Sequence, residues 1–301
     1  MTIPEAYAVC REIAKREAKN FYYAFRVLPQ HKSDAMCAIY AFMRRADDIA
    51  DDESMSVEQR RVVMAQWVDA WRASRSGGST EDAVFIALND AQRRFSIPDQ
   101  LLEELVQGTT MDLDPSQANT SGVQTFATFE ELYRYCYLVA SVVGLVCIRV
   151  FGYKDPRAEK LAEETGVAFQ LTNILRDVKE DAERGRIYLP QDMLCLFNVP
   201  LERVRELASN AQMTENERRL LREVGQRAEH YYRSADELLP LIDADSRAAL
   251  WVLVTIYHDL LKKIQGSGYE VFRERISVPT PQKLWILTQG AAMSVTNRVL
   301  A

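Results

Sequence analysis

The stretch TGVAFQLTNILRDVKEDAERGRIYLP, residues 165–190, decides how this chain folds. Gln170, Asn173, Asp177 and Asp181 follow one another at steps of three and four residues. This spacing places the four side chains on one face of a helix. The residues between them are mostly apolar, so we predict that the helix lies inside the protein with a polar, acidic face.

The two carboxylates on this face need compensation if they are buried. Two carboxylates ~6 Å apart repel by roughly 3 kcal/mol at an effective dielectric constant of ~20. A cation offsets that repulsion, and hard oxygen ligands at this spacing suit Mg²⁺, which is usually completed by water and substrate phosphate oxygens. A single D-x-x-x-D pair is more typical of a solvated helix surface, so the interpretation depends on whether the pattern recurs.

The pattern recurs in residues 43–52, MRRADDIADD. Asp47 and Asp51 again stand four residues apart, and Arg44 lies three residues before Asp47 on the same face. Alone, this segment could be a solvated helix end whose ion pairs contribute a few tenths of a kcal/mol each. Two such helices, each with an apolar flank, indicate a facing pair across a cavity. Four aspartates there would hold several Mg²⁺ ions around a diphosphate, and the ions would act as Lewis acids on its leaving oxygens.

The rest of the chain predicts an all-α fold in one domain, residues 1–301. Helical periodicity dominates, and no convincing strand pattern is present. The longest predicted loop is the polar segment 113–128, and the most apolar predicted helix spans 129–151. The segment SGGST at 76–80 is a short surface turn and no domain linker. We therefore expect ten or more helices around a shared core with a central cavity.

Composition restricts the partners and the compartment. The net charge of −6 and the pI of about 5.4 exclude a broad nucleic-acid footprint. The longest apolar run, 138–148, is about half of what a membrane span needs. The charged N-terminus predicts no signal peptide. We expect a cytoplasmic protein; peripheral contact with the inner membrane surface and the oligomeric state are left open. Reduced thiols are predicted for the five scattered cysteines, which are Cys10, Cys37, Cys136, Cys147 and Cys195.

The motifs resemble those of the squalene/phytoene synthase family. The resemblance rests on RRADDIAD at 44–51, YCYLVASVVG at 135–144, QLTNILRDVKED at 170–181, RIYLP at 186–190 and the aromatic block at 19–29. It extends over about residues 5–290. The resemblance implies the all-α isoprenoid-synthase fold and the head-to-head (1′–1) joining of two prenyl diphosphates. One substrate ionises, its allylic cation alkylates the double bond of the other, and a cyclopropylcarbinyl diphosphate forms. Some members stop there, and others ionise again and then lose a proton or accept a hydride from NADPH.

The resemblance also implies roles for individual residues. The Mg²⁺ ligands, for which Mn²⁺ is an alternative ion, would be Asp47, Asp51, Asp177 and Asp181, assisted by Asn173. The diphosphate oxygens would be contacted by Arg44, Arg176, Arg275 and Lys19. Tyr135 and Tyr257 match tyrosines near the diphosphates, and Gln170 matches the wall of the central cavity. The residues expected to carry the chemistry are Arg44, Asp47, Tyr135 and Asp177.

We also predict an apolar tunnel for the prenyl chains, because a carbocation needs a dry site lined by unreactive aromatic faces. The candidate tunnel residues are Phe21, Tyr40, Val139, Ala140, Val143, Gly144, Phe169 and Leu171. The small side chains at Ala140 and Gly144 would leave room for a chain to pass. For each aromatic residue, an ordinary place in the core is the alternative.

One departure from the family bears on the product. Some members carry a histidine shortly before the aromatic block, where this chain has Glu17; His31, His230 and His258 fall elsewhere. A tyrosine or the departing diphosphate would then accept a proton, and an enzyme that stops at the cyclopropyl stage is also compatible.

The segments at 141–153 and 178–190 resemble most those of bacterial presqualene diphosphate synthases of the hopanoid pathway. The preferred prediction is therefore Mg²⁺-dependent condensation of two farnesyl diphosphates to presqualene diphosphate. Phytoene, dehydrosqualene or squalene formation is the alternative, and NADPH use stays open because a missing G-x-G-x-x-G motif argues only weakly against it. A non-catalytic helical adaptor of the same fold is the alternative from another class; the intact aspartate pairs argue against it.

Overall fold

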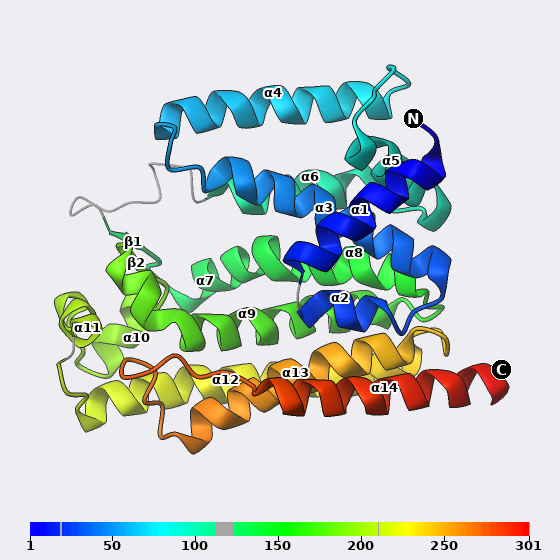
Figure 1. Cartoon of the computed structure of the whole chain (residues 1–301). Helices are drawn as coiled ribbons and strands as arrows, with labels where there is room; N and C mark the ends of the chain where they lie inside the picture. The colour runs from blue at the N-terminus through cyan, green and yellow to red at the C-terminus, as the bar shows by residue number, and fades with distance from the viewer. Residues whose placement is uncertain (19, 112–122, 210, 301) are drawn as a thin grey trace.

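The computed structural model describes the chain except for residues 19, 112–122, 210 and 301. The predicted all-α fold is confirmed, and Figure 1 shows its layers. The helices are α1 (Ile3–Glu17), α2 (Asn20–Phe25), α3 (Gln30–Ala50), α4 (Val57–Arg75), α5 (Ala83–Phe95), α6 (Asp99–Thr110), α7 (Phe129–Cys136), η3 (Tyr137–Ser141), α8 (Val142–Phe151), α9 (Arg157–Glu183), α10 (Gln191–Leu196), α11 (Leu201–Ala208), α12 (Glu215–Leu238), η4 (Leu239–Leu241), α13 (Arg247–Gly266) and α14 (Thr280–Leu300).

Helix α9, which carries the second acidic motif, occupies the middle of the molecule (Figure 1). It packs along α12 on one side and along η3 and α8 on the other. Leu171 and Leu175 on its apolar face are fully buried. Arg184 caps the helix, and Gly185 follows with a positive φ of 76°, a conformation that glycine adopts readily. The acidic side chains are therefore held on a rigid element in the interior.

Two very short strands correct the expectation of no strands. β1 (Gln124–Thr125), just before α7, and β2 (Arg186–Ile187), directly after α9, pair in parallel. Two residues per strand are too few for an alternating pattern, so the sequence carries no strand signal here. The pair lies beside the C-terminal end of α9 (Figure 1).

The predicted continuous helix over 129–151 is also corrected, because a π-helical turn, η3, interrupts it. Two glycines pack against this turn. A Cβ atom on Gly108 would lie 2.6 Å from the carbonyl oxygen of Leu138, and one on Gly166 would lie 2.5 Å from the Cα of Ser141. Only glycine allows α6 and α9 to approach the turn so closely.

The segment Phe129–Phe151 is also the one stretch of the described chain that is long and apolar enough to cross a membrane, with half of its most apolar window buried inside the protein. A core helix of a folded protein meets the same criterion, and this segment packs against α6 and α9. We therefore describe it as a core helix.

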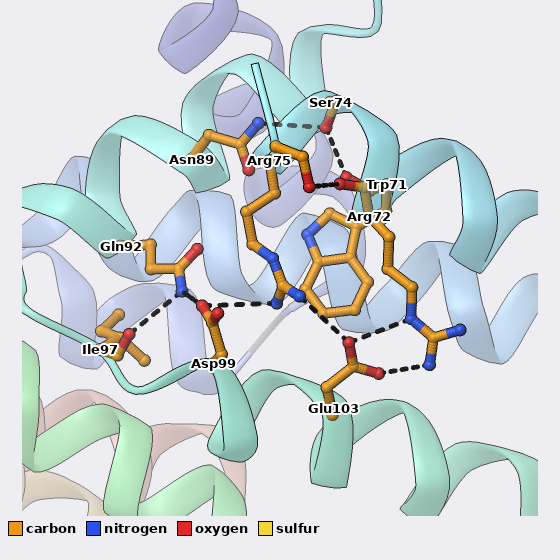
Figure 2. Close-up of polar contacts among 10 residues, drawn as sticks. Trp71, Arg72, Ser74, Arg75, Asn89, Gln92, Ile97, Asp99 and Glu103 are labelled. Atoms are coloured by element: carbon orange, nitrogen blue, oxygen red, sulfur yellow. Dashed lines mark hydrogen bonds and ion pairs between the residues drawn. The ribbon is translucent and has the colours of Figure 1, made fainter. Parts of the chain in front are cut away.

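A polar network fixes the outer helix α4 to α6 (Figure 2). Arg72 donates from Nε and Nη2 to the two carboxylate oxygens of Glu103, at 3.1 and 2.7 Å. The guanidinium of Arg75 lies 4.6 Å from the ring centre of Trp71 and reaches Glu103 at 3.3 Å and Asp99 at 3.5 Å. Because α4 also packs on α3, the network supports the helix that carries the first acidic motif.

Candidate active site

A cavity of about 250 Å³ lies between η3 and α8, α9, and α13, with single contributions from α2, α3 and α12. Of the residues singled out from the sequence, the wall contains Phe21, Val139, Ala140, Val143, Gly144, Phe169, Gln170, Asn173 and Tyr257. The remaining wall is mainly apolar and includes Met43, Cys147, Ile148, Phe151, Ala162, Leu238, Leu250 and Leu253. The structure thus joins the C-terminal part of the YCYLVASVVG segment to the polar face of α9 around one apolar space.

The two acidic motifs lie toward the same end of this cavity. Met43 of α3 and Asn173 of α9 both line it, and Asp47 and Asp177 each follow one helical turn later. Figure 1 shows that α3 and α9 run in the same direction and end on the side of the molecule where β1 and β2 lie. The cavity therefore has an acidic end and an apolar end.

Asp177 is held by two arginines. Arg176 donates from Nε to Oδ1 of Asp177 at 2.8 Å, and Arg275 donates to the same oxygen from Nε and Nη2 at 2.9 and 2.8 Å. Burial acts to raise the pKa of Asp177, but hydrogen bonds from Arg176 and Arg275 and their positive charges outweigh it, so the pKa lies below its ordinary value. Two of the predicted diphosphate-binding arginines, Arg176 and Arg275, thus form one cluster with the first aspartate of α9.

Asp181 behaves in the opposite way. Burial, and after it the negative charge of Asp177, raises the pKa of Asp181 to about 7. Two other oxygens of α9, Oδ1 of Asn173 two turns earlier and Oε2 of the adjacent Glu180, are buried and have no hydrogen-bond partner. Hard oxygen ligands of this kind fit Mg²⁺, and because Asn173 and Asp181 lie ~12 Å apart along the helix, they would serve different ions.

The described residues contain no group of three His, Cys, Asp or Glu side chains already gathered as a metal site. Asp47 is half-buried, and Asp51 is exposed at the C-cap of α3. Arg44 pairs with Asp48 at 2.6 Å, and its Nε is buried without an acceptor. The carboxylates of the first acidic motif are therefore accessible to an incoming metal ion.

Other predicted site residues lie away from the cavity wall. Tyr135 is buried and stacks on Tyr188 at 4.9 Å between ring centres, next to Phe126 at 5.2 Å. Tyr40 is half-buried against the core, and Leu171 is fully buried on another face of α9. Lys19 lies outside the described residues.

Tyr257 separates the cavity from a second, basic pocket. Its ring stacks on Phe169 at 4.4 Å, and burial raises its pKa. On its other side, Arg176, Arg275 and Lys283 line a pocket of about 150 Å³. Burial, and after it the charge of Arg176, lowers the pKa of Lys283. Sequence reasoning missed Lys283 because an isolated lysine at the start of a helix carries no pattern.

Comparison with known proteins identifies the family. The family model described as squalene/phytoene synthase matches residues 14–282. The 15-cis-phytoene synthase of Synechococcus elongatus is 35% identical over 94% of this chain and 91% of its own, and the phytoene synthase of Mycobacterium tuberculosis is 35% identical over 98% and 93%.

Solved structures agree with this assignment. A dehydrosqualene synthase in complex with ligand has a TM-score of 0.83 at 29% identity and covers 98% of both chains. A squalene synthase from Alicyclobacillus acidocaldarius has a TM-score of 0.78 at 24% identity, over 89% of this chain and 95% of its own, and supports the fold. The chain is therefore a prenyltransferase of the squalene/phytoene synthase family, whose members condense prenyl diphosphates head to head on the isoprenoid-synthase fold.

Proposed function

We propose that this enzyme condenses two molecules of farnesyl diphosphate and releases presqualene diphosphate in a reaction that depends on Mg²⁺. The observation that carries the substrate assignment is the length of the cavity. Its wall follows α9 from Asn173 to Ala162, which is ~16 Å at ~1.5 Å per residue. An extended C15 chain is on the order of 15 Å long, since each carbon–carbon bond is ~1.5 Å and the zigzag shortens the sum.

At the acidic end, we propose that Asp177, Asp181 and Asn173 of α9, with Asp47 and Asp51 of α3, hold the metal. When bound, Mg²⁺ supplies Lewis acidity at the leaving diphosphate. Arg44, Arg176, Arg275 and Lys283 bind the diphosphate oxygens as charge-assisted donors. Arg275, which is exposed and lies on Asp177, is free to turn from that carboxylate to an incoming diphosphate.

In the cavity, the chain's own residues protect the carbocation. The wall is apolar apart from Thr165, Gln170, Asn173 and Tyr257, so water is excluded. The faces of Phe169 and Tyr257 stabilise positive charge without reacting with it. Tyr257 keeps its proton because burial raises its pKa. The described wall residues therefore offer no ready base for a later proton loss, which leaves the departing diphosphate as the acceptor and is compatible with release at the cyclopropyl stage.

Phytoene synthesis from geranylgeranyl diphosphate is the second candidate. It is supported by the names of the curated relatives, which are phytoene synthases at 35% identity over nearly the whole chain. An extended C20 chain, on the order of 20 Å, would require the apolar end of the cavity to open beyond Phe151.

Product analysis by mass spectrometry distinguishes the candidates. The protein is incubated with each prenyl diphosphate and Mg²⁺, with and without NADPH, and one portion is dephosphorylated. We expect presqualene alcohol from the C15 substrate after dephosphorylation and no hydrocarbon. A C30 hydrocarbon would mean that the reaction continues, with or without NADPH, and phytoene would assign the C20 substrate. The variant Asp177→Asn should fold and lose turnover; unchanged turnover would contradict the metal assignment.

A further inference from the structure

The apolar end of the cavity is closed by three helix ends that are far apart in the sequence. Phe151 is the last residue of α8, Leu238 is the last of α12, and Leu250 lies in the first turn of α13. All three side chains are buried, with Phe151 at 0% exposure. The position of this closed end fixes how long a chain the cavity accepts.

A buried lysine on α3, Lys32, connects the end of α8 to the start of α13. The Nζ of Lys32 donates to the carbonyl oxygen of Phe151 at 2.8 Å, to Oδ1 of Asp245 at 2.7 Å and to Oγ of Ser246 at 3.0 Å. Ser246 is the N-cap of α13 and is completely buried. Lys32 itself is only 7% exposed. An ammonium has three protons to donate, and here each one has its acceptor.

The backbone reinforces the same junction. The N–H of Asp243 donates to the carbonyl oxygen of Gly152 at 2.9 Å, and Tyr153 forms an antiparallel bridge with Ile242. Gly152 has a φ of 83°, and a Cβ atom there would lie 2.1 Å from Oδ2 of Asp243. The chain after α8 is therefore pressed directly against the segment that leads into α13.

Burying an ammonium is unfavourable unless its hydrogen bonds are all made, and an apolar side chain of similar size could fill the same space. Unlike an apolar side chain, the lysine makes directional hydrogen bonds, and these fix the positions of the end of α8 and the start of α13 relative to α3. None of the residues assigned to metal, diphosphate or carbocation touches it in the described structure. The network thus has a geometric effect on the cavity and no chemical part in the reaction.

We propose that Lys32, through Phe151 and the N-terminus of α13, is a positioning residue that sets the longest prenyl chain the enzyme accepts. This inference rests on the proposed function, since it assumes that the cavity holds the prenyl chain. Loosening the junction lets Phe151 and Leu250 move apart and extends the cavity beyond its present end. A C20 chain then binds where only a C15 chain fits in the native enzyme.

The test compares Lys32→Met, which keeps the bulk of the side chain and removes its three hydrogen bonds, with Asp245→Asn, which removes only the charge of a partly exposed partner. Tyr7→Phe is the matched control. It deletes the buried hydrogen bond from Tyr7 to Asp90 at 2.9 Å, which joins α1 to α5 away from the cavity wall. The readout is the ratio of kcat/KM for the C20 substrate to that for the C15 substrate. The ratio of dissociation constants for the two unreactive thiolodiphosphate analogues is measured beside it.

We expect both ratios to shift toward C20 by about tenfold in Lys32→Met and by a smaller factor in Asp245→Asn, with no shift in Tyr7→Phe. A lowered melting temperature with ratios unchanged within about twofold would overturn the proposal, because a merely structural lysine affects stability alone. An equal shift in Tyr7→Phe would overturn it too, since general loosening would explain the result. If Lys32→Met does not fold, the two ratios measured for Asp245→Asn test the proposal: a shift toward C20 supports it, and unchanged ratios overturn it. If the native enzyme turns over neither substrate, the proposed function fails, and the binding ratios still test the role of Lys32.

Discussion

Removal of divalent metal should make the protein less stable as the pH rises through neutrality, and Asp181 should be responsible. Burial, and after it the charge of Asp177, raises the pKa of Asp181 to about 7 from an ordinary value of 3.8. The folded protein therefore holds this proton more tightly than the unfolded chain does. Its stabilising contribution is complete below about pH 4 and is lost as the pH rises through 7.

The size of this effect follows from the difference between the two pKa values. Each tenfold change in proton affinity corresponds to about 1.4 kcal/mol, which gives a ceiling of about 4 kcal/mol for Asp181. Its side chain is only half-buried, and solvent screening reduces the value, so we expect a loss of about 2 kcal/mol between about pH 5 and pH 8.5. Mg²⁺ with inorganic diphosphate should restore the stability at high pH, and its apparent affinity should fall below pH 7, because a carboxylate ligand must be deprotonated.

Urea unfolding with EDTA across this pH range measures the effect. Asp181→Asn cannot titrate at this position, so its stability should fall by about 2 kcal/mol less than that of the native protein over the same range. Glu183→Gln, an exposed position two residues further along α9, is the control and should follow the native curve. Equal slopes for the native protein and Asp181→Asn would refute the reasoning, because the titrating group would then be another residue.

Three further predictions concern other parts of the structure. Glu103→Ala should lower the free energy of unfolding by about 1–2 kcal/mol, because it removes the acceptor of two arginines in a partly exposed network; urea unfolding measures this, and a change below about 0.3 kcal/mol would contradict it. Gly166→Ala should lower the free energy of unfolding by about 2–3 kcal/mol and reduce turnover, since the new Cβ atom meets the backbone of Ser141. A free energy of unfolding equal to that of the native protein would contradict this, because the π turn would then have moved to admit the Cβ atom. Lys283→Met should raise KM about tenfold and leave urea unfolding nearly unchanged, and an unaltered KM would exclude Lys283 from diphosphate binding.

The sequence was sufficient for the features that depend on local periodicity. The all-α fold followed from helical periodicity, and the interior position of residues 165–183 followed from the apolar residues between the polar ones. Four of the predicted tunnel residues, Val139, Ala140, Val143 and Gly144, line the cavity. Periodicity failed at the junction between α7 and α8, because the π turn there is fixed by close contact with two glycines of other helices. A pattern within one helix contains no information about such a neighbour.

Features that depend on distant partners could not be read from the sequence. Lys32 and Asp245 are separated by 213 residues, and another acceptor of Lys32 is a backbone carbonyl, which has no side-chain signature. Tyr135 stacks on Tyr188 of the segment after α9, and no pattern within its own helix indicates this contact. Its expected place near the diphosphates stays a prediction.

The π turn at Tyr137–Ser141 has a consequence for how relatives of this enzyme can diverge. A π turn contains about one residue more than an α-helical turn, so it is equivalent to a one-residue insertion in a helix. Deleting one residue there would restore α-helical geometry and leave the residues that follow in nearly the same rotation about the helix axis, because the π turn already absorbs the extra residue within one turn. Val143, Gly144 and Cys147 would then still face the cavity, and the wall would change at Val139 and Ala140, which lie in the turn itself. A single-residue length difference in this segment would therefore reshape one side of the cavity and leave the rest of the helix in place.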